Sequence, residues 1–553
     1  AVLVLTSMTA RYVQQRIQTD RFEDQYLCFE AAEAAIQQGT AAINNGQTDL
    51  RIGIPDTWEA EFDQNGHLAL PNFEDDGIMP ASFVSNPNVE YIMYIHNWET
   101  DGRDTNGDGL VDSDDEEGMF SIHAAARLSG TAKSIEAVYD TRDFGIWNNA
   151  IFAGVGQSGA LINGNVNIAG SVHLLGDDLP EGALALNMSG TGMMRNNYTQ
   201  GKGPSHNNFL GNVLPRIPAL ATTEYDGNTV ETLNAELRVK NGIVAMSGNS
   251  HIGESQGAGD NFKGPVDSTW VTDGWGGNSG TSNVFSDNGT DEAYDLGNSI
   301  GFPILEDNYR DKDTGEFVYN PSTGTWYTHA EYFVEVLTGG KNRTPSGGTF
   351  NGDISLDAKG KKVGFYWNAT TGEYETGNAA NGANPDSDEH YILKKTNSDV
   401  IQINGCIHVD GDLSFTGKGT FAYHGAASIL VEGDVSIETD LLACDSSNNS
   451  NNYSHQSFPY NSCMGIMSRG PMELGLKSSQ RSMMGAFYSA SRVSCGKQLA
   501  IGGTIVGDYF EMGAQVPGIW QVPVLADNLP LGMIGDYPIF RTQLASWREI
   551  GVN

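Results

Sequence analysis

Apolar side chains recur at steps of three and four residues through the first 44 residues, and this spacing predicts one long amphipathic helix. No glycine or proline interrupts the run before Gly39, and Asn44, Asn45 and Gly46 then end it. At about 1.5 Å per residue, the helix would be roughly 65 Å long. A narrow apolar stripe on so long a helix usually packs against a partner outside its own domain. The stripe includes Tyr12, Ile17, Phe22, Tyr26, Phe29, Ala32 and Ile36.

After the helix, residues 46–150 have the composition of a compact β-rich domain. The segments VEYIMYIHNW (89–98) and MFSIHAAARL (119–128) are rich in the residues that strands favour, and we predict that they are central strands of a sheet. An acidic loop joins the two segments. We therefore expect an assembly helix over 1–45 and a second, β-rich domain over 46–150.

Beyond residue 150 a short repeat replaces these patterns. Glycines six residues apart occur twice, at Gly164, Gly170 and Gly176 and again around Gly411. Short strands punctuated by glycine at regular steps predict a β-solenoid, in which each coil buries its inward side chains on its neighbours. A β-sandwich with glycine-rich hairpins is the alternative. The repeated segments are GNVNI (164–168), GNSHI (248–252), GDISL (352–356), GDLSF (411–415) and GDVSI (433–437).

Within each repeat, alternation places Val166 and Ile168 on one face, and likewise Val435 and Ile437. These repeats predict a first part of the solenoid over 151–254 and a second part over 401–514.

Residues 255–400 interrupt the repeat with a segment rich in Gly, Asn, Asp, Trp and Tyr, which predicts an inserted loop subdomain projecting from the solenoid. Residues 515–553 contain four prolines and predict an extended tail with a short helix around QLASWREI. The predicted fold class is therefore mainly β: a long N-terminal α-helix, a β-rich calcium-loop domain, and a β-solenoid with a long insertion.

Charge narrows the choice of partners. The 553-residue chain carries 69 acidic and 31 basic residues, a formal net charge of −38. Such a surface repels phosphate backbones, so we expect no nucleic-acid partner. The acidity suits a protein that binds cations, although it also serves solubility alone. We see no apolar run of the roughly 18 residues that would span a bilayer.

Five cysteines are present, and Cys28 stands apart from the four in the last third of the chain. No C-x-x-C pair occurs, which argues against a zinc ribbon or a c-type haem site. Two disulfides, Cys444 with Cys463 and Cys406 with Cys495, are the simplest account and imply an oxidising compartment. Other pairings and four buried thiols stay open. Cys28 is either a small core residue or a contact with another subunit.

The sharpest local motif is DTNGDGLVDSDD, residues 104–115, which matches a calcium loop. Calcium needs six to eight hard oxygen ligands, and this spacing wraps them round one point. Gly109 permits the sharp turn, and Val111 would anchor the loop on the core. The expected cofactor is Ca²⁺, in a structural role. Its predicted ligands are Asp104, Asn106, Asp108, the carbonyl oxygen of Leu110, Asp112 and Asp115.

Other motifs carry less chemistry. The segment GVGQSG (154–159) fits a nucleotide-binding pattern, but no helix follows it. We predict no catalytic residues. A secreted β-solenoid enzyme acting on polysaccharide is the alternative function, since paired carboxylates occur on such folds. A carbohydrate-binding module is a third hypothesis, which depends on Trp270 and Trp275 in the insertion.

The first 40 residues resemble the N-terminal segment of type IV pilus minor pilins and related pilus-assembly proteins. The resemblance is carried by TSMTARYVQQRIQTDRFEDQYLCFEAAEAAI, with the signature FEAAEAA at residues 29–35. The chain departs from the family at Leu5, where pilins have an acid, and only AVLVL remains of the long apolar segment. The later glycine-rich pattern looks like bacterial surface proteins that join such a helix to a β-solenoid.

The resemblance implies a structural rather than an enzymatic protein. In the family, the helix first anchors the subunit in the inner membrane and then packs against neighbouring helices in a filament core. The implied function is a subunit of an extracellular pilus-like filament at the bacterial cell surface, displaying its β-solenoid, in an adhesive role. The implied partners are further copies of the chain and other pilins.

Overall fold

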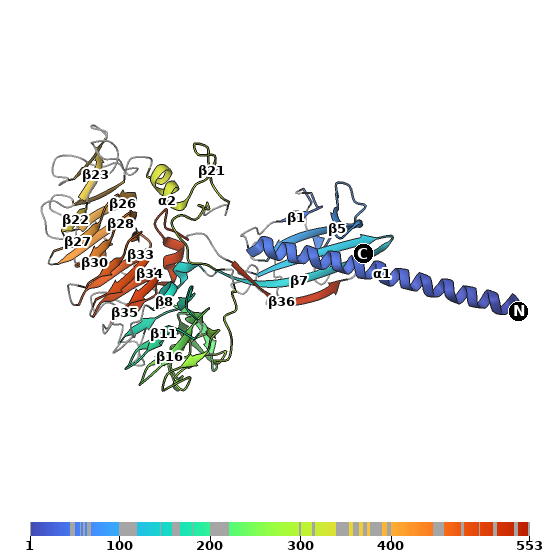
Figure 1. The fold of residues 1–553 in the computed structure, drawn as a ribbon, viewed down its shortest axis with the longest axis horizontal. Coiled ribbons are helices and arrows are strands. Elements are labelled where there is room, and N and C mark those ends of the chain that lie inside the picture. Colours follow the sequence, from blue (N-terminus) through green and yellow to red (C-terminus); the bar gives the residue numbers. More distant parts are fainter. Residues whose placement is uncertain are drawn as a thin grey trace. The chain divides into compact units, whose positions relative to one another are not determined.

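Figure 1 shows the computed structural model of the chain, which divides into two compact units. The first unit is residues 1–144 with 538–553, and the second is residues 145–537. Within the first helix, side chains are described at Arg16, Thr19 and 21–43. The structure describes the backbone of residues 2–44, 50–55, 57–58, 61–62, 68–98, 119–143, 145–157, 166–180, 182–198, 220–297, 300–311, 316–338, 353–357, 364–368, 373–376, 390–394, 400–417, 419–445, 458–476, 480–496, 498–512, 517–535 and 540–550.

The first unit is one helix packed on an antiparallel sheet. The predicted long helix is confirmed as α1 (Val2–Asn44), and the two predicted central strands are confirmed as an antiparallel pair, β5 and β6. The strand order is β1-β5-β6-β7-β36, with β4 also paired to β5. The strands are β1 (Arg51–Ile52), β2 (Glu61–Phe62), β3 (Leu68–Ala69), β4 (Ala81–Phe83), β5 (Asn86–Asn97), β6 (Met119–Leu128), β7 (Thr131–Asp143) and β36 (Phe540–Ile550).

The C-terminal strand completes this sheet. β36 pairs antiparallel with β7, from Phe540 opposite Asp143 to Ile550 opposite Ser134. The short helix predicted around QLASWREI is therefore wrong: those residues form the edge strand, where the sheet supplies hydrogen bonds that eight isolated residues could not supply as a helix. The second unit is inserted between two neighbouring strands of the sheet, and the chain leaves and re-enters at the same paired residues.

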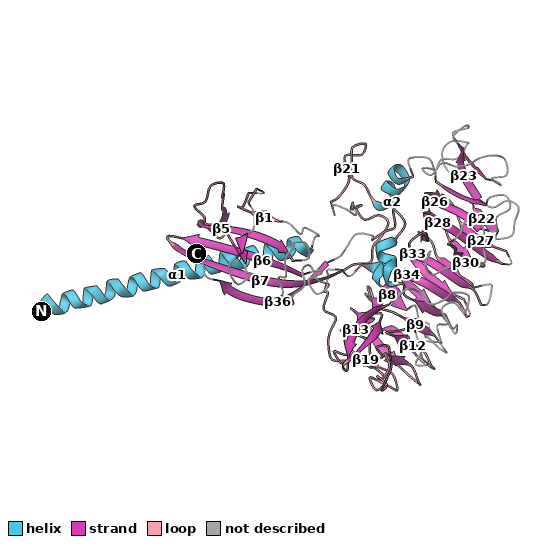
Figure 2. Ribbon diagram, turned by 180° about the vertical axis from the view of Figure 1, so that it is seen from behind, coloured by secondary structure: helices cyan, strands magenta, loops and turns pink. Residues whose placement is uncertain are grey.

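The second unit is built mainly of short strands in parallel ladders (Figure 2). Its strands are β8 (Ile151–Gln157), β9 (Asn167–Ala169), β10 (Val172–Leu174), β11 (Leu184–Met188), β12 (Met193–Arg195), β13 (Ala221–Tyr225), β14 (Asn228–Thr232), β15 (Glu236–Val239), β16 (Ile243–Met246), β17 (His251–Ile252), β18 (Ser268–Val271), β19 (Trp275–Gly276), β20 (Tyr319–Asn320), β21 (Thr325–Trp326), β22 (Ile354–Asp357), β23 (Gly364–Asn368), β24 (Glu373–Thr376), β25 (Tyr391–Lys394), β26 (Val400–Val409), β27 (Leu413–Thr416), β28 (Thr420–Val431), β29 (Val435–Ile437), β30 (Asp440–Ala443), β31 (Ser462–Ser468), β32 (Met472–Leu474), β33 (Ser482–Cys495), β34 (Ala500–Glu511) and β35 (Gly518–Trp520). Its helices are η1 (Ile146–Asn148), α2 (His329–Tyr332), η3 (Phe333–Leu337) and η5 (Pro523–Asn528).

The longest ladder runs β26-β28-β31-β33-β34-β8-β10-β15-β18, parallel at every step. We call this ladder and its neighbours the parallel stack. The ladder does not follow chain order: its first five strands come from residues 400 onward and its last four from residues before 272, and the two sets are joined where β34 pairs with β8. One column of register partners shows what stabilises the ladder: all of its members are buried, and all but the last, a threonine, are apolar. They are Ile407, Ile429, Ile466, Phe487, Ile505, Ile151, Val172, Leu237 and Thr269.

The glycine repeats seen in the sequence align in the stack. Ile354, Leu413 and Val435, from three of the repeats, are register partners on β22, β27 and β29. The predicted inward faces are confirmed, since Val166, Ile168, Val435 and Ile437 are all buried. At two of these turns an aspartate accepts a backbone N–H from the next coil: Asp353 from Asp412, and Asp412 from Asp434.

This contact explains the glycine of the repeat. The Asp412 carboxylate accepts the N–H of Asp434 at 2.8 Å, and a Cβ on Gly433 would lie 2.1 Å from that carboxylate oxygen. A side chain at this position would therefore displace the carboxylate.

Parts of the predicted insertion belong to the stack. β18 and β22 pair within it, and β25 joins it by antiparallel pairing with β26. Phe302 and Pro303 lie against the stack rather than projecting from it: the Phe302 ring lies 5.9 Å from Tyr488, whose hydroxyl donates to the Pro303 carbonyl at 2.7 Å.

Candidate assembly surface on the first helix

One face of α1 docks on the sheet of its own unit through small side chains. Cys28, Ala31, Ala32 and Ala35 are fully buried against β5, β6 and β7. Small residues let helix and sheet approach closely. Gly39 marks the tightest point, because a Cβ there would lie 2.8 Å from Ile122. Three alanines of the FEAAEAA signature, Ala31, Ala32 and Ala35, are therefore part of the docking face of the helix.

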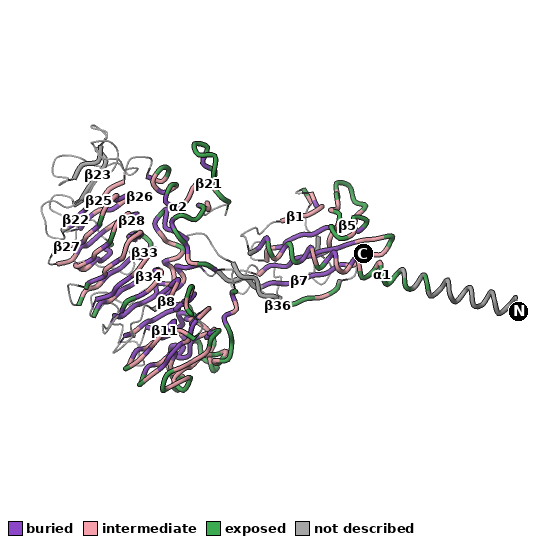
Figure 3. The backbone as a smooth tube through the Cα atoms, viewed as in Figure 1, coloured by how far each residue is buried: buried purple, intermediate pink, exposed green. Residues whose placement is uncertain are grey.

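The opposite face of α1 carries two aromatic rings that are not covered within the chain. Phe22 is 71% exposed and Tyr26 is 62% exposed. At about 100° per residue these positions share a side of the helix with Glu33 and Gln37, which are also exposed. Figure 3 shows this division, with buried and exposed residues alternating along α1 where it lies on the sheet.

The sequence pattern had placed these residues in one stripe, and that prediction is wrong in part. Ala32 and Ile36 are buried on the sheet, whereas Phe22 and Tyr26 point away from it. The three- and four-residue spacing drifts round a helix, so positions ten residues apart need not share a face. The small residues Cys28, Ala31 and Ala35 complete the docking face. A search for large apolar side chains therefore does not find this face.

Local contacts fix the boundary between the two faces. The ring of Phe29 packs edge-on against Trp547 of β36 at 5.9 Å. On the outward face, a hydrogen bond from the Tyr26 hydroxyl to Glu30 raises the pKa of Tyr26. Cys28 is a core residue: burial raises the pKa of its thiol to about 11, and its Sγ lies 3.5 Å from the Thr131 carbonyl. Of its two predicted roles, the structure places it in the core.

The sheet face away from α1 holds a buried polar cluster that the sequence did not reveal. Ser121 accepts a hydrogen bond from the Trp98 indole at 3.1 Å and lies 2.9 Å from Nε2 of His123. Glu136 lies 3.6 Å from the same Nε2 and also pairs with Arg548 of β36. A hydrolase relay would use both ring nitrogens for different partners. Here Nε2 of His123 is close to both Ser121 and Glu136, which is not the arrangement of such a relay. The cluster instead links β6, β7 and β36.

The predicted calcium ligands lie outside the described residues: Asp104, Asn106, Asp108, Leu110, Asp112 and Asp115. The structure describes the two ends of their loop, where Asn97 of β5 is paired with Phe120 of β6. Within the described ranges, no group of three or more His, Cys, Asp or Glu side chains is arranged to hold a metal ion. In the same described part of the chain, no helix is long and apolar enough to cross a membrane.

The predicted disulfides are absent: none of the five cysteines forms a disulfide, and all five are buried. Cys406 pairs with Ser428, Ser428 with Gly465, and Gly465 with Ala486 of β33. Three strand spacings of about 4.8 Å separate Cys406 from β33. Cys495 lies further along that strand, beyond the roughly 7 Å that a disulfide allows between Cα atoms.

Cys444 and Cys463 are also separate thiols rather than a closed loop. Cys444 packs on Val400 and Ala422, whereas Cys463 lies opposite Ala426 on β28. Burial raises the pKa of Cys444 to about 12 and raises that of Cys463 further. Both thiols are therefore protonated at neutral pH and behave as small core residues.

Two further predicted features have structural roles. Trp270 donates to Ser268 at 2.6 Å and lies beside Arg238, and Trp275 donates to the Thr290 carbonyl at 2.9 Å.

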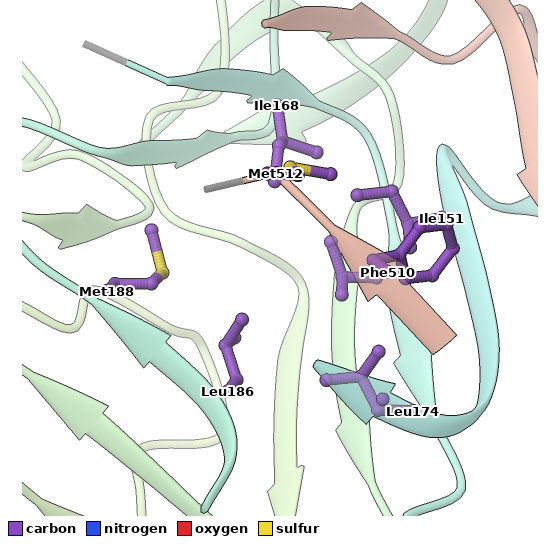
Figure 4. Close-up of a pocket in the computed structure, with 9 residues that line it drawn as sticks. Ile151, Ile168, Leu174, Leu186, Met188, Phe510 and Met512 are labelled. Carbon is purple, nitrogen blue, oxygen red and sulfur yellow. The ribbon is translucent and has the colours of Figure 1, made fainter. Parts of the chain in front are cut away.

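Figure 4 shows a small apolar cavity between β8, β10 and β34, lined by Ile151, Leu174, Phe510 and other apolar residues. Its volume is about 20 Å³. That is room for about one water molecule and far below the size of a ligand pocket.

Comparison with known proteins adds little. The chain matches no family profile and no curated protein. Among solved structures, it is similar to the competence-associated pilin ComZ from Thermus thermophilus, with a TM-score of 0.42 and 15% identity over 95% of this chain and 97% of that one. At this TM-score the two chains are not shown to share a fold.

Proposed function

We propose that the protein is a structural subunit of an extracellular pilus-like filament. The observation that carries this proposal is the two-sided helix. One face of α1 packs on its own sheet through small residues. On the opposite face the aromatic rings of Phe22 and Tyr26 are exposed to solvent. Exposed aromatic side chains on a helix mark an interaction surface, and like helices of other copies can bury them. The resemblance of the first 40 residues to pilins supports the same reading.

The proposal assigns a role to each part of the chain. The helix supplies assembly, with other copies and other pilins as partners and with the inner membrane as its place only before assembly. We infer that the parallel stack is a β-solenoid and that it is the part displayed at the bacterial cell surface. Adhesion is a proposed role of that surface. The enzyme acting on polysaccharide stays a prediction, with no described site in its favour.

We also propose that residues 104–115 bind Ca²⁺ in a structural role. The donor set fits the ion, because carboxylate, amide and carbonyl oxygens are the hard ligands that calcium prefers. The ends of the loop are held by paired strands, so an ion would pin a segment whose carboxylates otherwise repel one another.

The assembly proposal predicts that charge on the outward face blocks incorporation. In Phe22→Glu and Tyr26→Glu, a carboxylate would be buried between helices without a partner. We expect the subunit content of filaments sheared from cells to fall by about tenfold or more relative to the cell-associated protein. The positions are exposed in the single chain, so melting of the purified protein should change little.

Val84→Glu is the matched control, since Val84 is a 95% exposed apolar residue of the same unit that is not part of α1. It should incorporate like the parent. Normal incorporation of both helix variants would contradict the proposal.

A further inference from the structure

An exposed aromatic surface lies on the hairpin that contains β20 and β21 and stands out beside α2 (Figure 1). Residues 308–311 and 316–328 form a small antiparallel arrangement. Tyr309 donates its N–H to the Tyr327 carbonyl at 2.8 Å, and Tyr327 donates to Val318 at 2.9 Å. Backbone pairing therefore fixes where the side chains of the hairpin point.

The inner face of this hairpin is anchored to the rest of the unit. Tyr309 is buried and its ring stacks on Tyr332 at 3.8 Å. Immediately after the hairpin, His329 Nε2 donates to the Gly532 carbonyl at 2.9 Å. Phe333, in the following turn, is fully buried. The hairpin is thus a supported platform rather than a loose loop.

The outer face carries three aromatic rings that contact one another. Tyr319 meets Trp326 edge-on at 5.6 Å, and Phe317 lies 6.1 Å from Trp326. The Arg310 guanidinium lies over the Phe317 ring, 4.1 Å from the ring centre. The rings of Phe317, Tyr319 and Trp326 remain 39%, 54% and 46% exposed. We call these three residues the aromatic platform, and Figure 3 shows the β21 hairpin as largely exposed.

The exposed area and the charge around the platform indicate which class of ligand it can bind. Three rings of about 150–250 Å² each, about half exposed, offer on the order of 300 Å². A specific protein interface needs about 800 Å² on each partner. Glu316 directly precedes Phe317, and the chain has a net charge of −38, which opposes a phosphate backbone even with the Arg310 guanidinium over Phe317. A small, uncharged ligand with flat apolar faces fits better.

A hexose ring has that character, with a C–H face that packs on an aromatic ring and hydroxyl groups at its rim. Exposed hydroxyls are also present on the turn of this hairpin, where the Thr323 and Thr325 Oγ1 atoms lie 2.8 Å apart. We propose that the aromatic platform binds a neutral polysaccharide by stacking sugar rings on Tyr319 and Trp326. This site involves no residue of α1, so the proposal holds whether or not the chain assembles into a filament.

The test is calorimetric titration of the full chain with cellohexaose and with chitohexaose. Trp326→Ala and Tyr319→Ala should each weaken binding of the oligosaccharide that the parent binds by about tenfold or more. Tyr460→Ala is the control, because Tyr460 is 49% exposed and lies outside the platform. It should bind like the parent, and unchanged melting of each variant would show that the fold is intact.

Three results would overturn the proposal: no binding of either oligosaccharide, equal weakening by the Tyr460 control, or full binding by both platform variants. A single-stranded DNA oligonucleotide serves as the rival ligand. If it binds and Trp326→Ala abolishes that binding, the platform stacks nucleotide bases instead. Filament incorporation of Trp326→Ala should match the parent, which separates this test from that of the assembly proposal.

Discussion

At the scale of single residues, this protein uses small side chains where two elements meet. Gly39, Ala31 and Ala35 set the distance between α1 and its sheet, and the repeat glycines let an aspartate of one coil reach the backbone of the next. The buried cysteines fit the same pattern, since they act as small core residues and make no cross-links.

His329 makes the aromatic hairpin sensitive to acid. Burial lowers the pKa of His329 from about 6.5 to about 4. The unfolded chain therefore takes up a proton at a pH where the folded chain does not. The stability linked to this histidine is complete above about pH 6.5 and is lost as pH falls toward about pH 4.

Between about pH 7.5 and pH 4.5 this linkage costs roughly 2–3 kcal/mol of unfolding free energy. His329→Gln keeps a donor for the Gly532 carbonyl but cannot titrate. We expect its melting temperature to fall less than that of the parent between the two pH values. An equal fall in both proteins would show that His329 does not carry this pH dependence.

At the scale of elements, the sequence predicts type better than pairing. The long helix, the strands at 89–98 and 119–128 and the inward faces of the repeats follow from periodicity, and the structure confirms them. The edge strand at 540–550 could not be found this way, because its partner β7 lies about 400 residues earlier in the chain. Tertiary pairing, not local propensity, decides its conformation.

Cysteine spacing failed for a related reason. The sequence alone favours Cys444 with Cys463 and Cys406 with Cys495, but coil stacking decides which residues are close in space. The outward face of α1 was hidden because Phe22 and Ala32 both count as apolar in a spacing pattern, although only one of them contacts the sheet. Exposure of the rings on the 317–326 hairpin likewise has no signal in the sequence, because buried and exposed tyrosines look alike there.

Removal of calcium tests the predicted site in the loop between β5 and β6. Chelating calcium should lower the melting temperature of the purified protein and make residues 100–118 easier to cleave, because the loop carboxylates would repel one another. Asp108→Ala should melt like the chelated parent. Asp76→Ala, at an exposed acid of the same unit, should keep the response to chelator. Melting that does not change on chelation would contradict the site.

At the scale of the whole molecule, the order of the chain explains how one protein could combine the two proposed roles. The second unit enters and leaves the first at neighbouring strand ends, so a large insertion leaves the helix–sheet packing intact. A helix with one docked face and one bare aromatic face is then free to make contacts between copies. The aromatic platform belongs to the second unit and is chemically independent of that face.

The central claim is that the outward face of α1 is buried between copies of the chain. Electron cryo-microscopy of filaments from the native cell surface tests it most directly. The account predicts helical filaments built from this chain, with α1 near the axis and with Phe22 and Tyr26 in contact with helices of neighbouring subunits. Filaments in which α1 faces solvent, or single separated molecules in that fraction, would contradict it.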